Sequence, residues 1–254
     1  MKAIIWTAAA LTVAGFVGTA SAADYGAPYV PPAAPIFVPP AYDWNGFYLG
    51  AHLGAAWQQL SSATADPSTG AAGMPVGSES SFMGGGQLGV NFALWPNWLF
   101  GMEADISGAF LHGNGVATDA TGTIQVQYDS KTDMFGTVRG RAGYMWNNFL
   151  FYGTGGFAWA DGILTRTQLA GTTGGATPGV VDHASGISDG WVAGAGLEWA
   201  FAPKWTARFE YLHLDLGSHP YILPSAGFTR NVGSTIDVVR VGLNYRFNLL
   251  SLGP

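Results

Sequence analysis

The sequence predicts an all-β protein, an eight-stranded antiparallel up-and-down transmembrane β-barrel. Three observations lead to this prediction. Charged residues make up only 10% of the 254-residue chain and hydrophobic residues 48%, whereas soluble globular proteins carry about 25% charged residues. Eight segments alternate between apolar positions and polar or glycine positions, as half-buried strands do. The connections between them alternate between short turns and long polar loops, which is the layout of membrane-spanning barrels.

The first 22 residues are a predicted secretory signal peptide. Lys2 supplies the positive start, residues 4–17 supply the apolar core, and Ala20-Ser21-Ala22 supplies a cleavage site of small residues. A transmembrane anchor is the alternative, but the apolar core is shorter than the about 18 residues that a membrane helix needs. We therefore expect the chain to be exported.

Residues 23–43 are predicted to be a proline-rich periplasmic linker. Such a segment favours an extended polyproline conformation and cannot enter the interior of a sheet. A docking segment for another protein is the alternative, although only the prolines mark it. Six of the 14 prolines of the chain lie here: Pro28, Pro31, Pro32, Pro35, Pro39 and Pro40.

The barrel is predicted to span residues 44–247, and residues 248–254 form a C-terminal tail. In the first strand, Phe47, Leu49 and Leu53 share one face, and Tyr48 and His52 share the other. A period of two residues is typical of a strand with two different surroundings. The predicted strands cover 45–57, 82–94, 98–110, 132–146, 149–161, 189–201, 204–216 and 234–247.

The lengths of the connections predict which end of the barrel faces outward. Three are tight turns: Trp95-Pro96-Asn97, Asn147-Asn148 and Ala202-Pro203. Four are long and rich in Gly, Ser, Thr and Asp: 58–81, 111–131, 162–188 and 217–233. Outer-membrane barrels have short periplasmic turns and long external loops. We therefore expect a bacterial outer-membrane location, with both chain ends in the periplasm.

Aromatic residues gather at both ends of the predicted strands. Such rings prefer the headgroup region, and two girdles of them flank the apolar band of membrane barrels. The expected periplasmic girdle contains Trp44, Trp95, Trp98, Trp146, Phe149, Phe201, Trp205, Tyr245 and Phe247. The expected outer girdle contains Trp57, Phe82, Phe110, Trp159 and Trp191.

Alternation assigns nine charged side chains to the barrel interior. They are Glu103, Asp105, Arg139, Arg141, Glu198, Arg208, Glu210, Arg240 and Arg246. The interior of an eight-stranded barrel is only wide enough to be filled by side chains, and an unpaired buried ion costs several kcal/mol. We therefore expect an ion-pair network that plugs the lumen and leaves little or no solute conductance. The alternative is an ion pathway, as in a narrow porin.

Several kinds of site are excluded or disfavoured. The chain has no cysteine, which excludes disulfides and zinc–thiolate sites, and its ten basic residues are too few for a nucleic-acid surface. The neighbouring arginines would keep Glu103 and Asp105 ionised, which suits neither a general acid nor a general base. We expect no catalytic residues, no metal site and no cofactor.

The histidines allow two alternative functions. His112, His183 and His219 fall in or beside external loops and could bind haem or another ligand, although they lack a ligand-like spacing. A lipid-modifying enzyme is the second alternative, because Ser218, His219, and His213 near Asp215 supply the residue types of a hydrolase. Nothing in the sequence marks an activated serine.

The two ends of the predicted barrel resemble a known family. Residues 44–50, Trp-Asn-Gly-Phe-Tyr-Leu-Gly, and residues 241–247, Val-Gly-Leu-Asn-Tyr-Arg-Phe, resemble the small porin-like outer-membrane surface proteins of α-proteobacteria. The resemblance implies an eight-stranded barrel, surface exposure and a role in envelope integrity. Some members are described as haem-binding or as host-facing antigens. Such chains usually stop at the terminal aromatic residue that the barrel assembly machinery recognises, whereas seven residues follow Phe247 here.

The expected partners are outer-membrane lipid, lipopolysaccharide and the barrel assembly machinery. Acidic side chains assigned to the external loops could bridge to lipopolysaccharide through divalent cations, but we favour the simpler interpretation that they keep the loops solvated. These residues are Asp66, Glu79, Asp119, Asp129, Asp161, Asp182 and Asp189.

Overall fold

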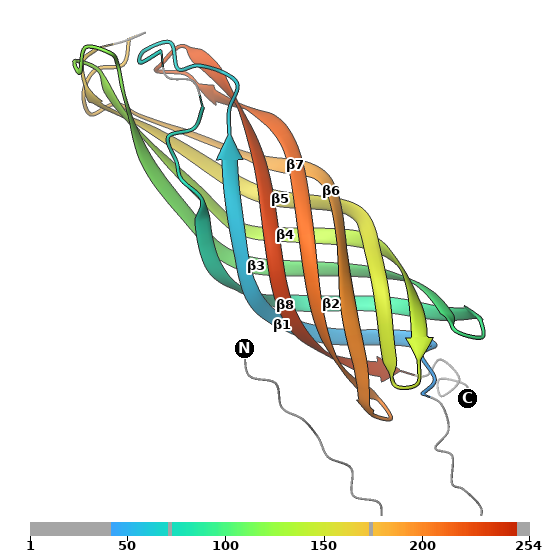
Figure 1. Ribbon diagram of the computed structural model, residues 1–254. Coiled ribbons are helices and arrows are strands. Elements are labelled where there is room, and N and C mark those ends of the chain that lie inside the picture. The colour runs from blue at the N-terminus through green and yellow to red at the C-terminus, as the bar shows by residue number, and fades with distance from the viewer. Residues whose placement is uncertain (1–41, 71–72, 173–174, 248–254) are drawn as a thin grey trace, which may run out of the picture. The chain divides into compact units, whose positions relative to one another are not determined.

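The computed structural model describes residues 42–70, 73–172 and 175–247. They form a closed antiparallel barrel in which each strand pairs with the next and β1 pairs with β8 (Figure 1). The strands are β1 (Gly46–Ser61), β2 (Glu79–Trp95), β3 (Trp98–Thr118), β4 (Gln125–Trp146), β5 (Phe149–Ala170), β6 (Val181–Ala202), β7 (Trp205–Leu223) and β8 (Phe228–Phe247). The predicted fold class is confirmed. The signal peptide, most of the linker and the tail 248–254 lie outside the described residues.

The periplasmic turns are as short as the sequence predicts. Two residues each join β2 to β3, β4 to β5 and β6 to β7. Asn147 in the second turn has a φ of 52°, a left-handed conformation that asparagine tolerates better than most residues. The part of the chain that the structure describes contains no helix long and apolar enough to cross a membrane.

The strands extend further at the external end than predicted. β5 continues to Ala170 and β6 begins at Val181, where the abundance of Ser, Thr, Gly and Asp suggested a loop. In β4 and β7 the register shifts at Thr132/Met134 and at Asp215/Ser218, so β-bulges break the period-two pattern. The external connections are therefore only 62–78, 119–124, 171–180 and 224–227. Only the first remains long.

The outward surface of the barrel carries the exposed apolar residues. Large apolar side chains such as Leu53, Phe209 and Val241 are 47–65% exposed, as expected for a wall that faces lipid. Outward aromatic residues lie at both ends of this band, including Trp57, Phe82, Phe110 and Trp191 externally and Trp95, Trp98, Trp146 and Phe201 on the periplasmic side. We call the strand segments between these two girdles the membrane part and those beyond the outer girdle the external part.

Trp44 is an exception to the predicted girdle. Only 3% of it is exposed, and it packs inside the periplasmic end of the barrel with Leu99, Leu150 and Tyr152. The prediction was wrong because Trp44 precedes β1, so the alternation of the strand does not set its direction. Its ring stacks edge-on against Tyr42 at 4.7 Å.

Candidate functional site

The charged side chains predicted to face inward are all buried in the structure, and eight of them form one cluster. Four arginines and four carboxylates meet here, so the cluster, which we call the charged network, is electrically balanced. The arginines are Arg139, Arg141, Arg208 and Arg240. The carboxylates are Glu103, Asp105, Glu198 and Glu210. They come from β3, β4, β6, β7 and β8.

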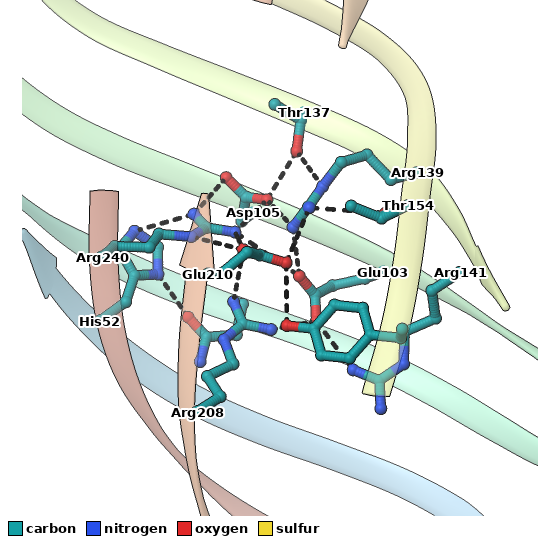
Figure 2. Close-up of polar contacts among 12 residues, drawn as sticks. His52, Glu103, Asp105, Thr137, Arg139, Arg141, Thr154, Arg208, Glu210 and Arg240 are labelled. Carbon is teal, nitrogen blue, oxygen red and sulfur yellow. Dashed lines mark hydrogen bonds and ion pairs between the residues drawn. The ribbon is translucent and has the colours of Figure 1, made fainter. Parts of the chain in front are cut away.

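Each arginine at the centre of the charged network contacts more than one carboxylate. Arg139 pairs with Glu103, with Asp105 at 2.9 Å and with Glu210 at 3.1 Å. Arg240 pairs with Asp105 at 3.2 Å and with Glu210 at 2.6 Å. Figure 2 shows these carboxylates converging between the arginines. The planar guanidinium, with donors on several sides, suits this bridging geometry better than a lysine would.

Arg141 lies between two tyrosine rings. Its guanidinium carbon is 5.1 Å from the ring centre of Tyr48 and 4.8 Å from that of Tyr152, which is cation–π geometry. The rings fit because glycine stands opposite each: a Cβ at Gly89 would overlap the Tyr48 ring, and one at Gly196 the Tyr152 ring. Gly89 and Gly196 therefore leave the space that these two rings occupy.

Uncharged side chains complete the charged network, and charge alone did not reveal them. Thr137 donates to Asp105 at 2.6 Å, Tyr152 donates to Glu210 at 3.0 Å, and Asn244 donates to Glu198 at 3.0 Å. His52 contacts Ser107 at 2.8 Å and lies 3.5 Å from Arg240. All of them occupy the inward positions of the alternation, which is the signal that could have found them.

Arg246 corrects the predicted set, because it lies apart from the charged network. Its guanidinium lies 3.9 Å from the Asp43 carboxylate and 4.3 Å from the centre of the Tyr42 ring. The physical reason is its place at the end of β8, one inward position beyond Asn244. Arg246 therefore belongs to the periplasmic mouth, beside Tyr42.

A layer of apolar side chains lies directly above the charged network, on its external side. All eight strands contribute to this central apolar layer, whose members are nearly or completely buried. The residues are Ala56, Met83, Ala109, Leu111, Phe135, Ala158, Ala160, Val192, Leu212, Leu214, Leu216, Ile236 and Val238. Above it, a cavity of about 30 Å³ is lined in part by Gln58, Ser130 and Ser234. That volume has room for roughly two water molecules.

The first external loop packs into the external mouth of the barrel. The buried carboxylate of Asp66 accepts a hydrogen bond from Tyr128 and lies 3.5 Å from Arg166. Arg230 donates to Tyr128 at 2.9 Å and also to the carbonyl of Gly73. Val76 of the same loop joins an apolar cluster with Leu164 and Val232. We call this arrangement of loop 62–78 on the barrel mouth the external cap.

Two acidic residues at the external end of the barrel are buried, contrary to the expectation. Asp66 and Asp182 are 0% and 4% exposed instead of solvated, and Asp182 accepts hydrogen bonds from the backbone of Ser225 and Ala226. Burial raises the pKa of the Asp66 carboxyl, but hydrogen bonds from Ser68 and Tyr128 and the charge of Arg166 outweigh it and leave the pKa below its usual value. The sequence did not reveal this site because its partners come from three distant segments.

The three histidines proposed for ligand binding lie on separate strands. His112 on β3 lies 3.7 Å from Asp133, His183 on β6 contacts Thr165 at 3.0 Å, and His219 on β7 contacts the carbonyl of Leu216 at 2.8 Å. Within residues 42–70, 73–172 and 175–247, no group of three His, Asp or Glu side chains is placed to hold a metal ion. The structure thus gives each histidine its own local partner.

The residues named for a lipid hydrolase do not assemble into a catalytic arrangement. His213 contacts Asp237 at 2.8 Å, and the carboxylate of Asp215 accepts from the backbone of Gly217. His219, next to Ser218, contacts backbone atoms. In the charged network, Glu103 and Asp105 are held in ion pairs, which is a poor arrangement for transferring protons.

Comparisons with known proteins agree with this architecture. The family model described as outer membrane protein beta-barrel domain matches residues 8–247. The chain is 31% identical to the 31 kDa outer-membrane immunogenic protein of Brucella melitensis, over 97% of this chain and 100% of that one. It is also 31% identical to the 25 kDa outer-membrane immunogenic protein of Brucella abortus, over 97% and 99%. A 22 kDa outer membrane protein of Rhizobium leguminosarum is 30% identical over 83% and 81%.

Proposed function

Because the chain belongs to the outer membrane protein beta-barrel domain family and lies in the bacterial outer membrane, we propose that it is a structural barrel with a closed interior. It supports envelope integrity, presents its external end at the cell surface and conducts little or no solute. The resemblance to α-proteobacterial surface proteins is confirmed by the Brucella and Rhizobium relatives. The name "immunogenic" carried by the Brucella proteins supports surface exposure of the corresponding loops here.

The observation that carries the proposal is the central apolar layer. A hydrated ion that crossed the barrel would have to pass side chains such as Phe135, Leu212 and Ile236, each 0% exposed. Hydrophobic constrictions exclude water and ions even where they are not sterically closed. This layer separates the charged network from the external cap, so the two polar regions do not form one continuous path.

The charged network supports the same proposal from the periplasmic side. A porin keeps its interior charges hydrated, whereas the side chains of Arg139, Arg208 and Arg240 are all 0% exposed. At this depth each charged group interacts with an opposite charge in place of the water molecules that would otherwise hydrate it. We accordingly propose no ion pathway and no catalytic activity for the protein. Its proposed partners are outer-membrane lipid, lipopolysaccharide and the assembly machinery.

A matched pair of phenylalanine substitutions tests the closed interior. Phe135→Ala removes a buried ring from the central apolar layer, while Phe209→Ala removes an outward ring that is 53% exposed. In liposomes that contain the refolded protein, we expect no salt efflux from the wild type or Phe209→Ala and a measurable leak from Phe135→Ala. Rapid efflux through the wild type would contradict the proposal.

The role in the envelope needs a cellular experiment. Cells that lack the protein should become more sensitive to detergents and to large apolar antibiotics, because the outer membrane normally excludes both. Expression of the wild type or of Phe209→Ala should restore resistance. Unchanged sensitivity of the deletion strain would argue against a role in envelope integrity, whatever the conductance.

A further inference from the structure

A shallow apolar groove runs along the outward face of the barrel where β1 meets β8. It has a volume of about 290 Å³, and its walls are Ala51, Leu53, Val241 and Leu243. His52 and Gly242 line its floor. The groove opens onto the lipid-facing surface, where the small Ala51 pairs across the strands with the larger Leu243. Its chemistry therefore fits a hydrocarbon chain.

The same seam leads toward the external end to a polar cluster on the outward face. The paired residues follow in the order Leu53 with Val241, Ala55 with Val239, and Trp57 with Asp237. At about 3.3 Å per residue, Asp237 lies roughly 13 Å along the strand from Val241. A lipid whose chain occupied the groove would therefore place its headgroup near Asp237.

Asp237 is held in a fixed position by two neighbours on β7. Its Oδ1 accepts a hydrogen bond from the hydroxyl of Tyr211 at 2.6 Å and contacts Nδ1 of His213 at 2.8 Å. Because a carboxylate only accepts, His213 carries its proton on Nδ1. Both of these contacts, from Tyr211 and from His213, end on Oδ1 and leave Oδ2 of Asp237 unused by them. One carboxylate oxygen is thus left for a ligand.

Exposed aromatic side chains occupy outward positions on the strands next to this carboxylate. Trp57 pairs across the strands with Asp237 and is 40% exposed, and Tyr211 is 45% exposed. The ring of Trp191, 51% exposed, lies 5.7 Å from that of His213. Aromatic faces beside a carboxylate are the chemistry that binds an ammonium group.

The charge of the surrounding surface has the matching sign. Beyond the outer girdle, Lys131 is the only Lys or Arg that points outward in the described part of the chain, and it is paired with Asp133 at 2.6 Å. β5, β6 and β7 each add an outward aspartate at a similar height: Asp161, Asp189 and Asp215. Such a surface attracts cations and repels an unshielded phosphate.

We propose that the β1–β8 groove and the Asp237 cluster together bind an outer-leaflet lipid whose headgroup carries an ammonium group. One acyl chain lies against Ala51, Leu53 and Val241, and the ammonium lies between the Asp237 carboxylate and the rings of Trp57 and Tyr211. The site is on the outer wall, so it depends on the outer-membrane location and not on whether the lumen conducts.

Lipid retention measures the site directly. The refolded protein is placed in nanodiscs of equal parts phosphatidylethanolamine, phosphatidylcholine and phosphatidylglycerol, and native mass spectrometry identifies the lipids that remain bound. An exposed ion pair between the ammonium and the Asp237 carboxylate predicts up to roughly fivefold preference for the ammonium-bearing lipids. Asp237→Asn should abolish it. A preference for phosphatidylcholine would identify a quaternary ammonium, and one for phosphatidylethanolamine a primary one.

Asp161→Asn is the matched control, because it removes an outward aspartate from β5 on another part of the wall. This variant should keep the wild-type preference. The proposal would be overturned if the wild type retained phosphatidylglycerol as well as the ammonium-bearing lipids. It would also be overturned if Asp161→Asn lost the preference to the same extent as Asp237→Asn, because only the general surface charge would then act. If Asp237→Asn does not refold, Trp57→Leu gives the same readout.

Discussion

The membrane part and the external part of the barrel are built from the same strands, but their inward and outward faces carry different kinds of side chain. In the membrane part of β4, Arg139 and Arg141 point inward while Val138 faces lipid. In the external part of the same strand, Val126 is buried inside while Gln127 and Asp129 lie on the outer face. The bulge at Thr132/Met134 lies between the two.

This difference between the two parts follows from the change of solvent outside the barrel. Lipid cannot hydrogen-bond, so polar groups in the membrane part gather inside and must pair with one another. Water bathes the external part, so many of its polar groups face outward. Its interior combines an apolar cluster that includes Val126 and Leu164 with the buried and paired Asp66 and Arg166. The external part additionally needs loop 62–78 to cover its interior, because β1 and β2 end lower than their neighbours (Figure 1).

The largest effect is expected from breaking the charged network. Arg139→Ala leaves Glu103, Asp105 and Glu210 short of a positive partner, and removing one member of a buried ion pair costs about 3–5 kcal/mol. Urea unfolding in micelles should show this loss, and Arg208→Ala should behave alike.

Arg246→Ala is the control, because its ion pair with Asp43 lies outside the charged network and Asp43 is largely exposed. Its loss should be no more than about 1 kcal/mol. If Arg139→Ala instead produced large conductance steps with unchanged stability, the network would be a gate.

A smaller and local effect is expected in the external cap. Asp66→Asn removes the charge that pairs with Arg166 and weakens the acceptor of the Tyr128 hydrogen bond. Loss of about 1–2 kcal/mol should let loop 62–78 open roughly tenfold more often, without unfolding the barrel. Limited proteolysis of intact cells should cut this loop faster. Asp119→Asn, in the exposed turn 119–124, should leave the rate unchanged; equal cleavage of both variants would argue against the cap.

Acid should loosen the external cap through the same residue. The folded pKa of Asp66 is below its usual value, so its contribution to stability is complete above the unfolded pKa of about 3.9 and falls as the pH drops through the lower folded value. Protease cleavage of loop 62–78 should therefore rise below about pH 4 in the wild type and should depend less on pH in Asp66→Asn. An identical pH profile in both would assign the effect to other groups.

The smallest effect is expected from the C-terminal tail. β8 is fully paired with β1 and β7 up to Phe247 and Tyr245 respectively, so its pairing does not require residues 248–254. Deleting these residues should leave assembly in the outer membrane unchanged, as measured by heat-modifiable migration on gels. Failure to assemble would show that the assembly machinery uses the tail.

The sequence predicted the membrane part well because lipid imposes a regular pattern on it. Strict alternation located Glu103, Arg139 and Arg240 inside, and the two-residue turns defined where strands end. Arg246 was misplaced because alternation gives the face of a side chain but not which neighbours it reaches. Trp44 was misplaced because it precedes β1, where the alternation does not apply.

The external part was harder to predict for two physical reasons. Bulges at Thr132/Met134 and Asp215/Ser218 interrupt the alternation, and the outward polar residues of a water-exposed strand have the composition of a loop. The external cap depends on contacts of Asp66 with Tyr128 and Arg166. Tyr128 follows Asp66 by 62 positions along the chain, and Arg166 follows it by 100. No local pattern encodes such a contact.

Single-channel recording of the refolded wild type in a planar bilayer tests the closed interior most directly. The central apolar layer and the charged network predict a flat current trace at moderate voltage in concentrated salt, from protein whose folding is verified by heat-modifiable migration. Reproducible open steps that scale with the amount of folded protein would contradict the account and would favour a narrow porin.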